Sequence, residues 1–232
     1  MIDGRRAVRY DAEQACRELA LADPKLGQLI EQAGPFLLRL QSQHSPFEAL
    51  LESIIYQQLH GKAAGAILRR LLTAFGELHP APEHLLQASD EMLRAAGLSA
   101  SKTKALRDLA AKTIDGTVPT ISQIRRMPDD EIVKRLTEVR GIGTWTVEML
   151  LIFRLGRPDV FPTSDYGIRK GFALTFLGLK PSLKVTPDLL PRAEAMQWRA
   201  RRWAPWRSAA SWYLWRACDL ANSEAAGRRT TA

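Results

Sequence analysis

Apolar residues recur along this chain at helical spacing, and no segment alternates apolar and polar residues with a period of two. In the segment that begins at Ser45-Pro46, Phe47, Leu51 and Ile54 form one stripe, which is the pattern of a helix with one buried face. Proline, glycine, serine and aspartate mark helix ends between such stripes. The pattern predicts helices over residues 11–21, 24–33, 46–57, 62–75, 82–88, 89–96, 101–114, 121–127, 128–138, 146–153, 164–176, 187–197 and 206–222.

These segments predict an all-α protein without a convincing strand. We expect Asp23 to cap the helix that starts at Pro24. The polar ends of the chain, residues 1–9 and 223–232, are expected to fray.

The last predicted helix carries more aromatic surface than one buried face needs. At about 100° per residue, Trp215 falls nearly opposite the apolar stripe, with Trp212 beside it. Two interpretations stay open: the helix lies between two packed layers, or Trp215 belongs to an aromatic wall that faces a cleft.

The segment Val139-Arg140-Gly141-Ile142-Gly143-Thr144-Trp145-Thr146 joins two of the predicted helices. Glycine permits positive φ and lets a backbone approach a ligand closely. The N–H groups that open the second helix, with its dipole behind them, favour an anion. This helix–turn–helix hairpin is therefore a candidate seat for a phosphate, one that reads no base sequence.

Composition sharpens the picture. The chain has 232 residues, a net charge of +8 and a sequence pI of about 9.8. This excess of positive charge fits a protein that binds a polyanion, and it fits equally well a basic protein that has no such partner. Its two cysteines argue against a disulfide framework and against a four-cysteine metal or iron–sulfur site. No apolar run approaches a membrane span, and the first ten residues lack a signal-peptide core, so we expect an intracellular protein.

Asp165 stands at the expected start of a helix, about twenty residues past the hairpin. Taken alone, an aspartate in this position is most simply an N-cap. Its position after the hairpin reduces the weight of that simple reading.

Four motifs in this order carry a resemblance. They are Ser53-Ile54-Ile55-Tyr56-Gln57-Gln58-Leu59, the hairpin motif, Phe161-Pro162-Thr163-Ser164-Asp165-Tyr166 and Trp203-Ala204-Pro205-Trp206-Arg207-Ser208. With them, residues 20–222 resemble the helix-hairpin-helix (HhH-GPD) DNA glycosylases, in the branch of 3-methyladenine DNA glycosylase II. The resemblance implies two all-α lobes with the active site in the cleft between them and no N-terminal β domain. The expected lobes are residues 1–46 with 156–232, and residues 47–155, which end in the hairpin at about 129–153.

The resemblance also implies an activity, namely the hydrolysis of the N-glycosidic bond of an alkylated purine that has been flipped out of duplex DNA. Asp165 is the implied catalytic carboxylate. The residues implied for the base pocket are Tyr56, Trp145, Met149 and Trp215, and an aromatic pocket suits a cationic purine. For Trp145, a buried place in the core is an equally good reading.

DNA contacts are implied on two turns. Gln58 matches the wedge that fills the gap left by the flipped base, and His60 follows it; both also fit an exposed polar turn. The hairpin residues implied to contact DNA are Arg140, Gly141, Gly143 and Thr144. In relatives the hairpin carbonyls hold a Na⁺ or K⁺ ion, here those of Thr137, Val139 and Ile142; we expect no other cofactor. The basic segments 102–107 and 199–207 are either phosphate contacts or solvated faces.

Departures from the family narrow the activity. Trp145 stands where bifunctional members have a lysine, so we expect a monofunctional glycosylase without lyase activity. Ser164 replaces a second aspartate and Met149 a tyrosine of the bacterial inducible enzyme, which leaves the range of bases open. We expect a monomer that binds double-stranded DNA, in the cytoplasm of a bacterium or the nucleus of a eukaryote. The alternative is a non-catalytic protein that binds damaged DNA.

Overall fold

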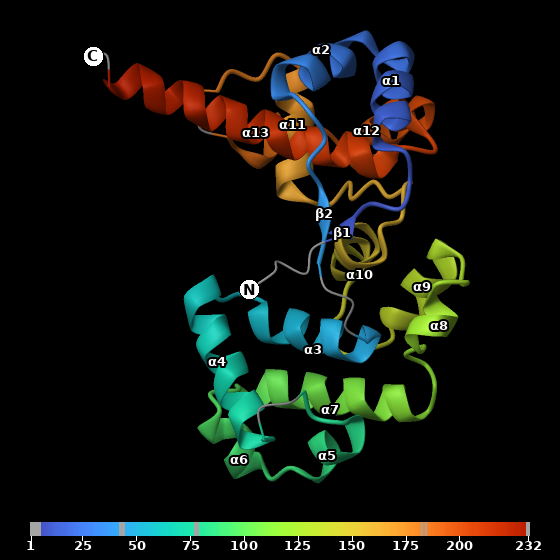
Figure 1. Cartoon of the computed structure of the whole chain (residues 1–232). Coiled ribbons are helices and arrows are strands. Elements are labelled where there is room, and N and C mark those ends of the chain that lie inside the picture. Colours follow the sequence, from blue (N-terminus) through green and yellow to red (C-terminus); the bar gives the residue numbers. More distant parts are fainter. Residues whose placement is uncertain (1–5, 42–44, 77–78, 182, 184, 231–232) are drawn as a thin grey trace. The chain divides into compact units, whose positions relative to one another are not determined.

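The computed structural model describes residues 6–41, 45–76, 79–181, 183 and 185–230, and most of them are helical (Figure 1). The chain forms two compact units: unit 1 comprises Met1–Ser42 and Leu151–Ala232, and unit 2 comprises Gln43–Leu150. The boundaries expected from the sequence, at 46/47 and 155/156, lie a little later. The backbone explains the difference, because the Gln41 N–H donates to the Phe153 carbonyl at 2.9 Å and ties the turn after residue 150 to unit 1.

Unit 2 contains eight of the described helices and ends in the hairpin. Their bounds are α3 (Pro46–Tyr56), α4 (Gly61–Ala74), α5 (Pro82–Gln87), α6 (Asp90–Ala95), α7 (Ala100–Ile114), α8 (Ile121–Ile124), α9 (Asp129–Leu136) and α10 (Thr144–Leu150). The predicted stripe of Phe47, Leu51 and Ile54 on α3 is buried, and α3 packs along α7. Leu136 of α9 and Val147 of α10, the two helices of the hairpin, are also fully buried.

Unit 1 is built around two crossing helices. Its elements are β1 (Arg6–Ala7), α1 (Ala12–Ala22), α2 (Pro24–Ala33), β2 (Arg39–Leu40), the π-helical turn η1 (Leu151–Leu155), α11 (Tyr166–Phe176), the 3₁₀ turn η2 (Pro187–Leu189), α12 (Ala193–Ala200), the 3₁₀ turn η3 (Arg201–Trp203) and α13 (Arg207–Thr230). Helix α13 crosses α11 in close contact and also contacts α1 and α2 (Figure 1). Residues 208–214 are buried on all sides of the helix, so the interpretation of a helix between two layers is confirmed for this stretch.

Some expectations about the elements are wrong. β1 and β2 form an antiparallel pair of two residues each, which is too short to produce a period-two pattern. The predicted helix 187–197 is a 3₁₀ turn followed by α12, and the predicted helix 146–153 becomes a π-helical turn at Leu151. Helix α13 continues to Thr230 instead of ending near 222, because Glu, Ala and Arg are strong helix formers and no proline follows. No helix in the described ranges is both long and apolar enough to cross a membrane.

Candidate functional site

The hairpin turn presents backbone N–H groups at the start of α10. Gly141 has a φ of 81°, in the left-handed region, and Gly143 follows with an exposed backbone. A Cβ atom built on Gly143 would meet nothing within 4 Å. Within the described residues, the amides of Gly143 and Thr144 have no hydrogen-bond acceptor, as expected for the first turn of a helix. The turn therefore has the open approach and the donors that a phosphate needs.

The hairpin is held in place by side chains that the sequence did not single out. The Gln57 amide Nε2 donates to the Gly141 carbonyl at 2.8 Å. The Arg140 N–H donates to Asp108 Oδ2, on α7, at 2.7 Å. Because both contacts reach the backbone of the turn, they fix its path without using its outward-facing amides. Gln57 lies inside a recognised motif, whereas nothing in the local sequence marks Asp108.

Carbonyl oxygens of the same turn fit an alkali cation. The Val139 carbonyl accepts one hydrogen bond, from the Ile142 N–H at 3.0 Å, and a carbonyl oxygen has a second lone pair. Backbone oxygens are suitable ligands for hard monovalent ions. The Val139 carbonyl therefore has a lone pair left for the cation that the resemblance implies at Thr137, Val139 and Ile142.

A hollow of about 590 Å³ lies on unit 2 beside the hairpin. It brings together three residues expected in a base pocket and the expected wedge, and its lining consists of Ser53, Tyr56, Gln57, Gln58, Gly141, Trp145, Thr146 and Met149. Trp145 is 45% exposed and Tyr56 is 43% exposed, so the reading of Trp145 as a buried core residue is wrong. Exposed aromatic faces around a hollow of this size suit a planar ring.

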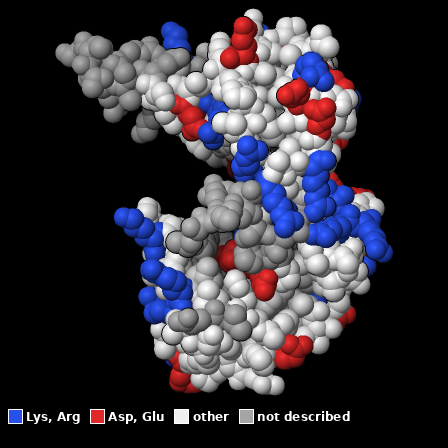
Figure 2. Space-filling model, in the orientation of Figure 1, with Lys and Arg blue, Asp and Glu red and all other residues white. Residues whose placement is uncertain are grey.

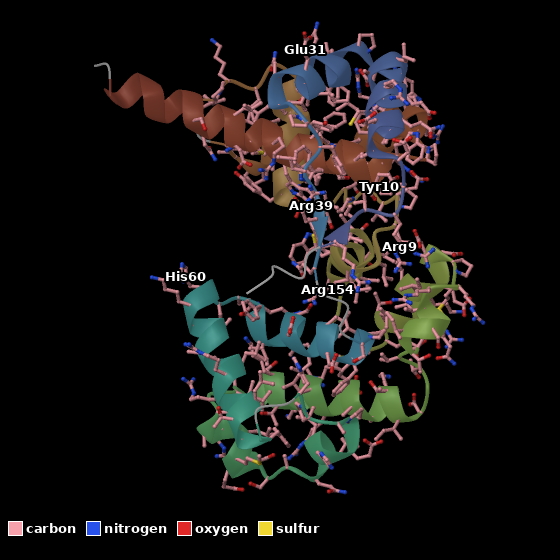
Figure 3. The ribbon with its side chains drawn as sticks, in the orientation of Figure 1. Arg9, Tyr10, Glu31, Arg39, His60 and Arg154 are labelled. Carbon is pink, nitrogen blue, oxygen red and sulfur yellow. The ribbon has the colours of Figure 1, made fainter. Side chains whose placement is uncertain are left out.

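The turn between α3 and α4 borders this hollow. Gln58 has a φ of 56°, the one positive value among the described residues other than glycine, and such a backbone is often retained for function. His60 is exposed and caps α4, because its Nδ1 accepts from the Lys62 N–H at 3.3 Å. Figure 2 shows Lys and Arg side chains along α4, and Figure 3 labels His60 at its start. The turn therefore combines a constrained polar tip with a basic helix.

Some of the basic residues in the two expected phosphate-binding segments have structural roles. Lys102 Nζ donates to the carbonyls of Ile55 and Gln57, the latter at 3.0 Å, and burial lowers the pKa of Lys102. Arg107 pairs with Asp90 at 2.7 Å. Lys102 and Arg107 are therefore not simply solvated residues, since their donors hold the end of α3 and the packing of α6 on α7.

Unit 1 shows the same pairing for its second basic segment. Asp23 is fully buried and accepts from Arg199 at 2.7 Å through both carboxylate oxygens, and from the Trp203 indole at 3.1 Å. Burial alone would raise the pKa of Asp23, but these donors outweigh it and hold the pKa below its usual value. Arg207 pairs with Asp159 at 2.6 and 2.7 Å. The carboxylate expected to be only a helix cap is thus the centre of a buried ion pair.

Other arginines of unit 1 remain available to a ligand. Arg6, Arg9 and Arg39 are exposed on or next to the β1–β2 pair, and Figure 3 labels Arg9 and Arg39. In the described part of the chain the side chains of these three arginines have no hydrogen-bond or ion-pair partner. They are therefore candidates for contacts with an anion.

Asp165 caps α11 and also has a long-range partner. Its Oδ1 accepts from the Ile168 N–H at 2.8 Å and from the Trp215 indole N–H at 2.9 Å. The side chain is only partly buried. Trp215 in turn packs against Phe153, with ring centroids 5.5 Å apart. The structure thus bears out the cap reading and adds a second donor, so the carboxylate is held at a defined place in unit 1.

Comparisons with known proteins bear on this arrangement. The model of the family described as "HhH-GPD superfamily base excision DNA repair protein" matches residues 51–186, more than half of the chain. The chain belongs to this superfamily. The matched range contains the hollow, the hairpin and Asp165, whereas Trp215 and the β1–β2 arginines lie outside it.

Relatives in this superfamily cover most of the chain. The DNA-3-methyladenine glycosylase 1 of Schizosaccharomyces pombe is 39% identical over 186 residues, which are 79% of this chain and 77% of that protein. A solved structure of the S. pombe 3-methyladenine DNA glycosylase in complex with abasic DNA has a TM-score of 0.73 and 35% identity, and covers 87% of this chain and 95% of that one. A solved structure of the Bacillus halodurans DNA-3-methyladenine glycosidase has a TM-score of 0.79 and 30% identity, and covers 90% of this chain and 91% of that one. The all-α fold of this superfamily is therefore confirmed.

Proposed function

We propose that this chain is a monofunctional DNA glycosylase that removes alkylated purines, such as 3-methyladenine and 7-methylguanine, from double-stranded DNA in base excision repair. One observation carries the proposal: Asp165 is fixed by two donors, at 2.8 and 2.9 Å, in a chain that also has a phosphate seat and an aromatic hollow. Membership of the superfamily, and relatives named as 3-methyladenine glycosylases, support it.

The reaction follows from the charges involved. The bond between the sugar C1′ and the base nitrogen breaks, its electron pair leaves with the base, and a water oxygen adds to C1′ and loses a proton. Positive charge develops on the sugar before the water adds. A fixed carboxylate such as Asp165 stabilises that charge without reorganising, and it accepts or orients the proton of the water.

The hollow on unit 2 supplies the recognition of the base. An alkylated purine carries positive charge before it leaves, and the faces of Tyr56 and Trp145 attract such a cation. Met149 adds a polarisable apolar contact. Because a cationic base is already a good leaving group, no general acid is required next to it.

Contacts with the DNA backbone then hold the flipped nucleotide. The amides of Gly143 and Thr144 bind a phosphate, with Arg140 and Gly141 beside them in the turn. Gln58 enters the stack as the wedge, and His60 contacts the minor groove next to it. A monovalent cation at the hairpin carbonyls would draw a phosphate oxygen toward the same turn. The activity otherwise needs no cofactor.

The absence of lyase activity belongs to the same proposal. A lyase needs an amine nucleophile that forms a Schiff base with C1′. Trp145 stands at the corresponding place in the hairpin, and the hollow is lined by no lysine among the described residues. We also propose that the protein acts as a monomer, in the compartment that holds the genome.

A non-catalytic protein that binds damaged DNA is the second candidate. It is favoured by one observation: Asp165 already has a structural role, as the cap of α11. An aspartate at this place could be retained for the helix alone. The two candidates predict different outcomes for base release, so one assay separates them.

The test is a base-release assay with purified protein and duplex DNA that carries single lesions. The lesions are 3-methyladenine, 7-methylguanine, 1-methyladenine, ethenoadenine and hypoxanthine. We expect release of 3-methyladenine without added divalent metal or nucleotide, and abasic DNA that is not cleaved and not trapped by borohydride. Binding to these duplexes with no release of any base would establish the non-catalytic candidate. Trapping of a covalent adduct would refute the monofunctional assignment.

A further inference from the structure

The packing of α13 on α11 places Trp215 beside Asp165. The two helices cross in close contact (Figure 1), and a hydrogen bond between them runs from the Trp215 indole to Asp165 Oδ1 at 2.9 Å. A second contact spans the same crossing, where the Cys218 thiol donates to the Gly167 carbonyl at 3.4 Å. The position of the carboxylate thus depends on how closely α13 approaches.

Two glycines on one face of α11 permit this approach. A Cβ atom on Gly171 would lie 2.0 Å from the Leu214 carbonyl oxygen, so the backbones of the two helices touch there. A Cβ atom on Gly167 would lie 2.7 Å from Trp215 Cδ1 and 3.1 Å from Asp165 Oδ1. Neither glycine has a left-handed backbone conformation. Glycine is therefore needed at these two positions because a Cβ atom would collide with α13, and not because of the backbone conformation.

The spacing of these residues explains the geometry. Gly167 and Gly171 are one turn apart and share a face of α11. Leu214, which meets Gly171, directly precedes Trp215 in α13. Close contact at Gly171 therefore delivers the next side chain of α13 to the space left by Gly167, where the indole N–H reaches the carboxylate.

We infer that Trp215 is a positioning residue for Asp165, and that Gly167 and Gly171 are present to let its indole reach the carboxylate. This inference rests on the proposed function, in which Asp165 faces the cationic sugar. The Ile168 N–H fixes Asp165 from its own helix, and the indole fixes it from the neighbouring helix. With two donors on one oxygen, the carboxylate is held in one orientation before DNA binds.

The alternative role for Trp215 is to stack on the flipped base as a wall of the base pocket. Binding measurements distinguish this role from the positioning of Asp165. The probes are two duplexes, one with a cationic pyrrolidine analogue of the abasic sugar and one with a neutral tetrahydrofuran analogue. Preference for the cationic probe measures how well the carboxylate meets a positive sugar. Stacking on a base affects neither probe selectively, because both lack the base.

The variants remove the donor in two ways. Trp215→Phe deletes the indole N–H and keeps an aromatic ring against Phe153, whereas Gly167→Ala displaces the indole. Trp206→Phe is the matched control, since the Trp206 indole also donates to a carboxylate of unit 1, that of Glu18. Thermal unfolding of each variant reports on the fold.

We expect the wild type to prefer the cationic probe. In both Trp215→Phe and Gly167→Ala that preference should fall about tenfold or more, since tenfold is near the lower end of the range for one hydrogen bond to a charged group. Binding of the neutral probe and the control Trp206→Phe should be unchanged. The single-turnover rate of 3-methyladenine release should fall with the preference.

Three outcomes would overturn the inference. The first is a Trp215→Phe variant that keeps the full preference, the second is an equal loss of affinity for both probes, and the third is the same loss in Trp206→Phe. A wild type without any preference for the cationic probe would instead contradict the proposed role of Asp165 itself. Failure of the inference and failure of the proposed function are therefore distinguishable.

Discussion

Replacing Asp165 by asparagine removes one negative charge and keeps the size of the side chain. The asparagine Oδ1 can still accept from the Ile168 N–H and the Trp215 indole, which lie 2.8 and 2.9 Å from the native oxygen. We therefore expect the cap of α11 to persist and the unfolding temperature to change little. Because the side chain volume and the Oδ1 acceptor are retained, we expect the lost charge to dominate any effect on the rate.

The size of that effect follows from the electrostatics of a partly buried carboxylate. At about 4 Å from a unit positive charge, with an effective dielectric constant of about 20, the attraction is about 4 kcal/mol. Since each ~1.4 kcal/mol is a factor of ten in rate, Asp165→Asn should slow base release about 10³-fold. A neutral substitution elsewhere in unit 1, Asp188→Asn on an exposed 3₁₀ turn, should leave the rate unchanged.

The assay is single-turnover release of 3-methyladenine from duplex DNA with protein in excess, together with the Kd for the same duplex. A rate for Asp165→Asn within tenfold of the wild type would refute the catalytic assignment. So would a Kd that weakens by the same factor as the rate, because the carboxylate would then act in binding and not in the bond-breaking step.

Three further substitutions test other parts of the molecule. Asp23→Asn should lower the free energy of unfolding by about 3 kcal/mol at pH 7, the range for a broken buried pair. The pKa of Asp23 is depressed in the folded state, so protonation removes the stabilisation in the wild type as well. The difference in unfolding temperature between wild type and variant should therefore shrink as the pH falls below about 4. Gly143→Asp places a negative charge in an open space of the hairpin and should weaken binding of damaged and undamaged duplexes alike, measured by fluorescence anisotropy. If Arg9 and Arg39 each contact a phosphate, the double variant Arg9→Gln with Arg39→Gln should reduce the slope of the logarithm of the DNA-binding constant against the logarithm of the salt concentration by about 2. The control is Arg17→Gln, whose native side chain pairs with Glu13; it should leave this slope unchanged.

Helix content and the buried stripes could be predicted because both are local. Phe47, Leu51 and Ile54 lie one turn apart in the sequence, and each faces the core of unit 2. A two-residue strand pair has no such local signature. Its partners, Ala7 and Arg39, are far apart in the sequence, so only the folded backbone brings them into register.

The roles of individual charges could not be predicted for the same reason. Lys102 and Arg199 belong to basic segments for which the sequence leaves open phosphate contacts or solvated faces. Their acceptors are the carbonyls at the end of α3 and the carboxylate of Asp23, which are distant in sequence. In the sequence Arg39 cannot be told from any other surface arginine. The structure shows that its side chain has no hydrogen-bond or ion-pair partner among the described residues. Composition thus predicts an anionic partner but does not select the side chains that meet it.

Asp165 shows where local reasoning ends and tertiary structure begins. Its place before a helix predicts a cap, and the cap is present. A cap alone needs only the Ile168 N–H, and serine or asparagine would serve as well. What the cap does not require is the indole of Trp215, which reaches Asp165 only because Gly167 leaves no Cβ in its way. Two glycines one turn apart in α11 are the one sequence signal of this contact, since adjacent small residues on a helix face favour close approach of a second helix.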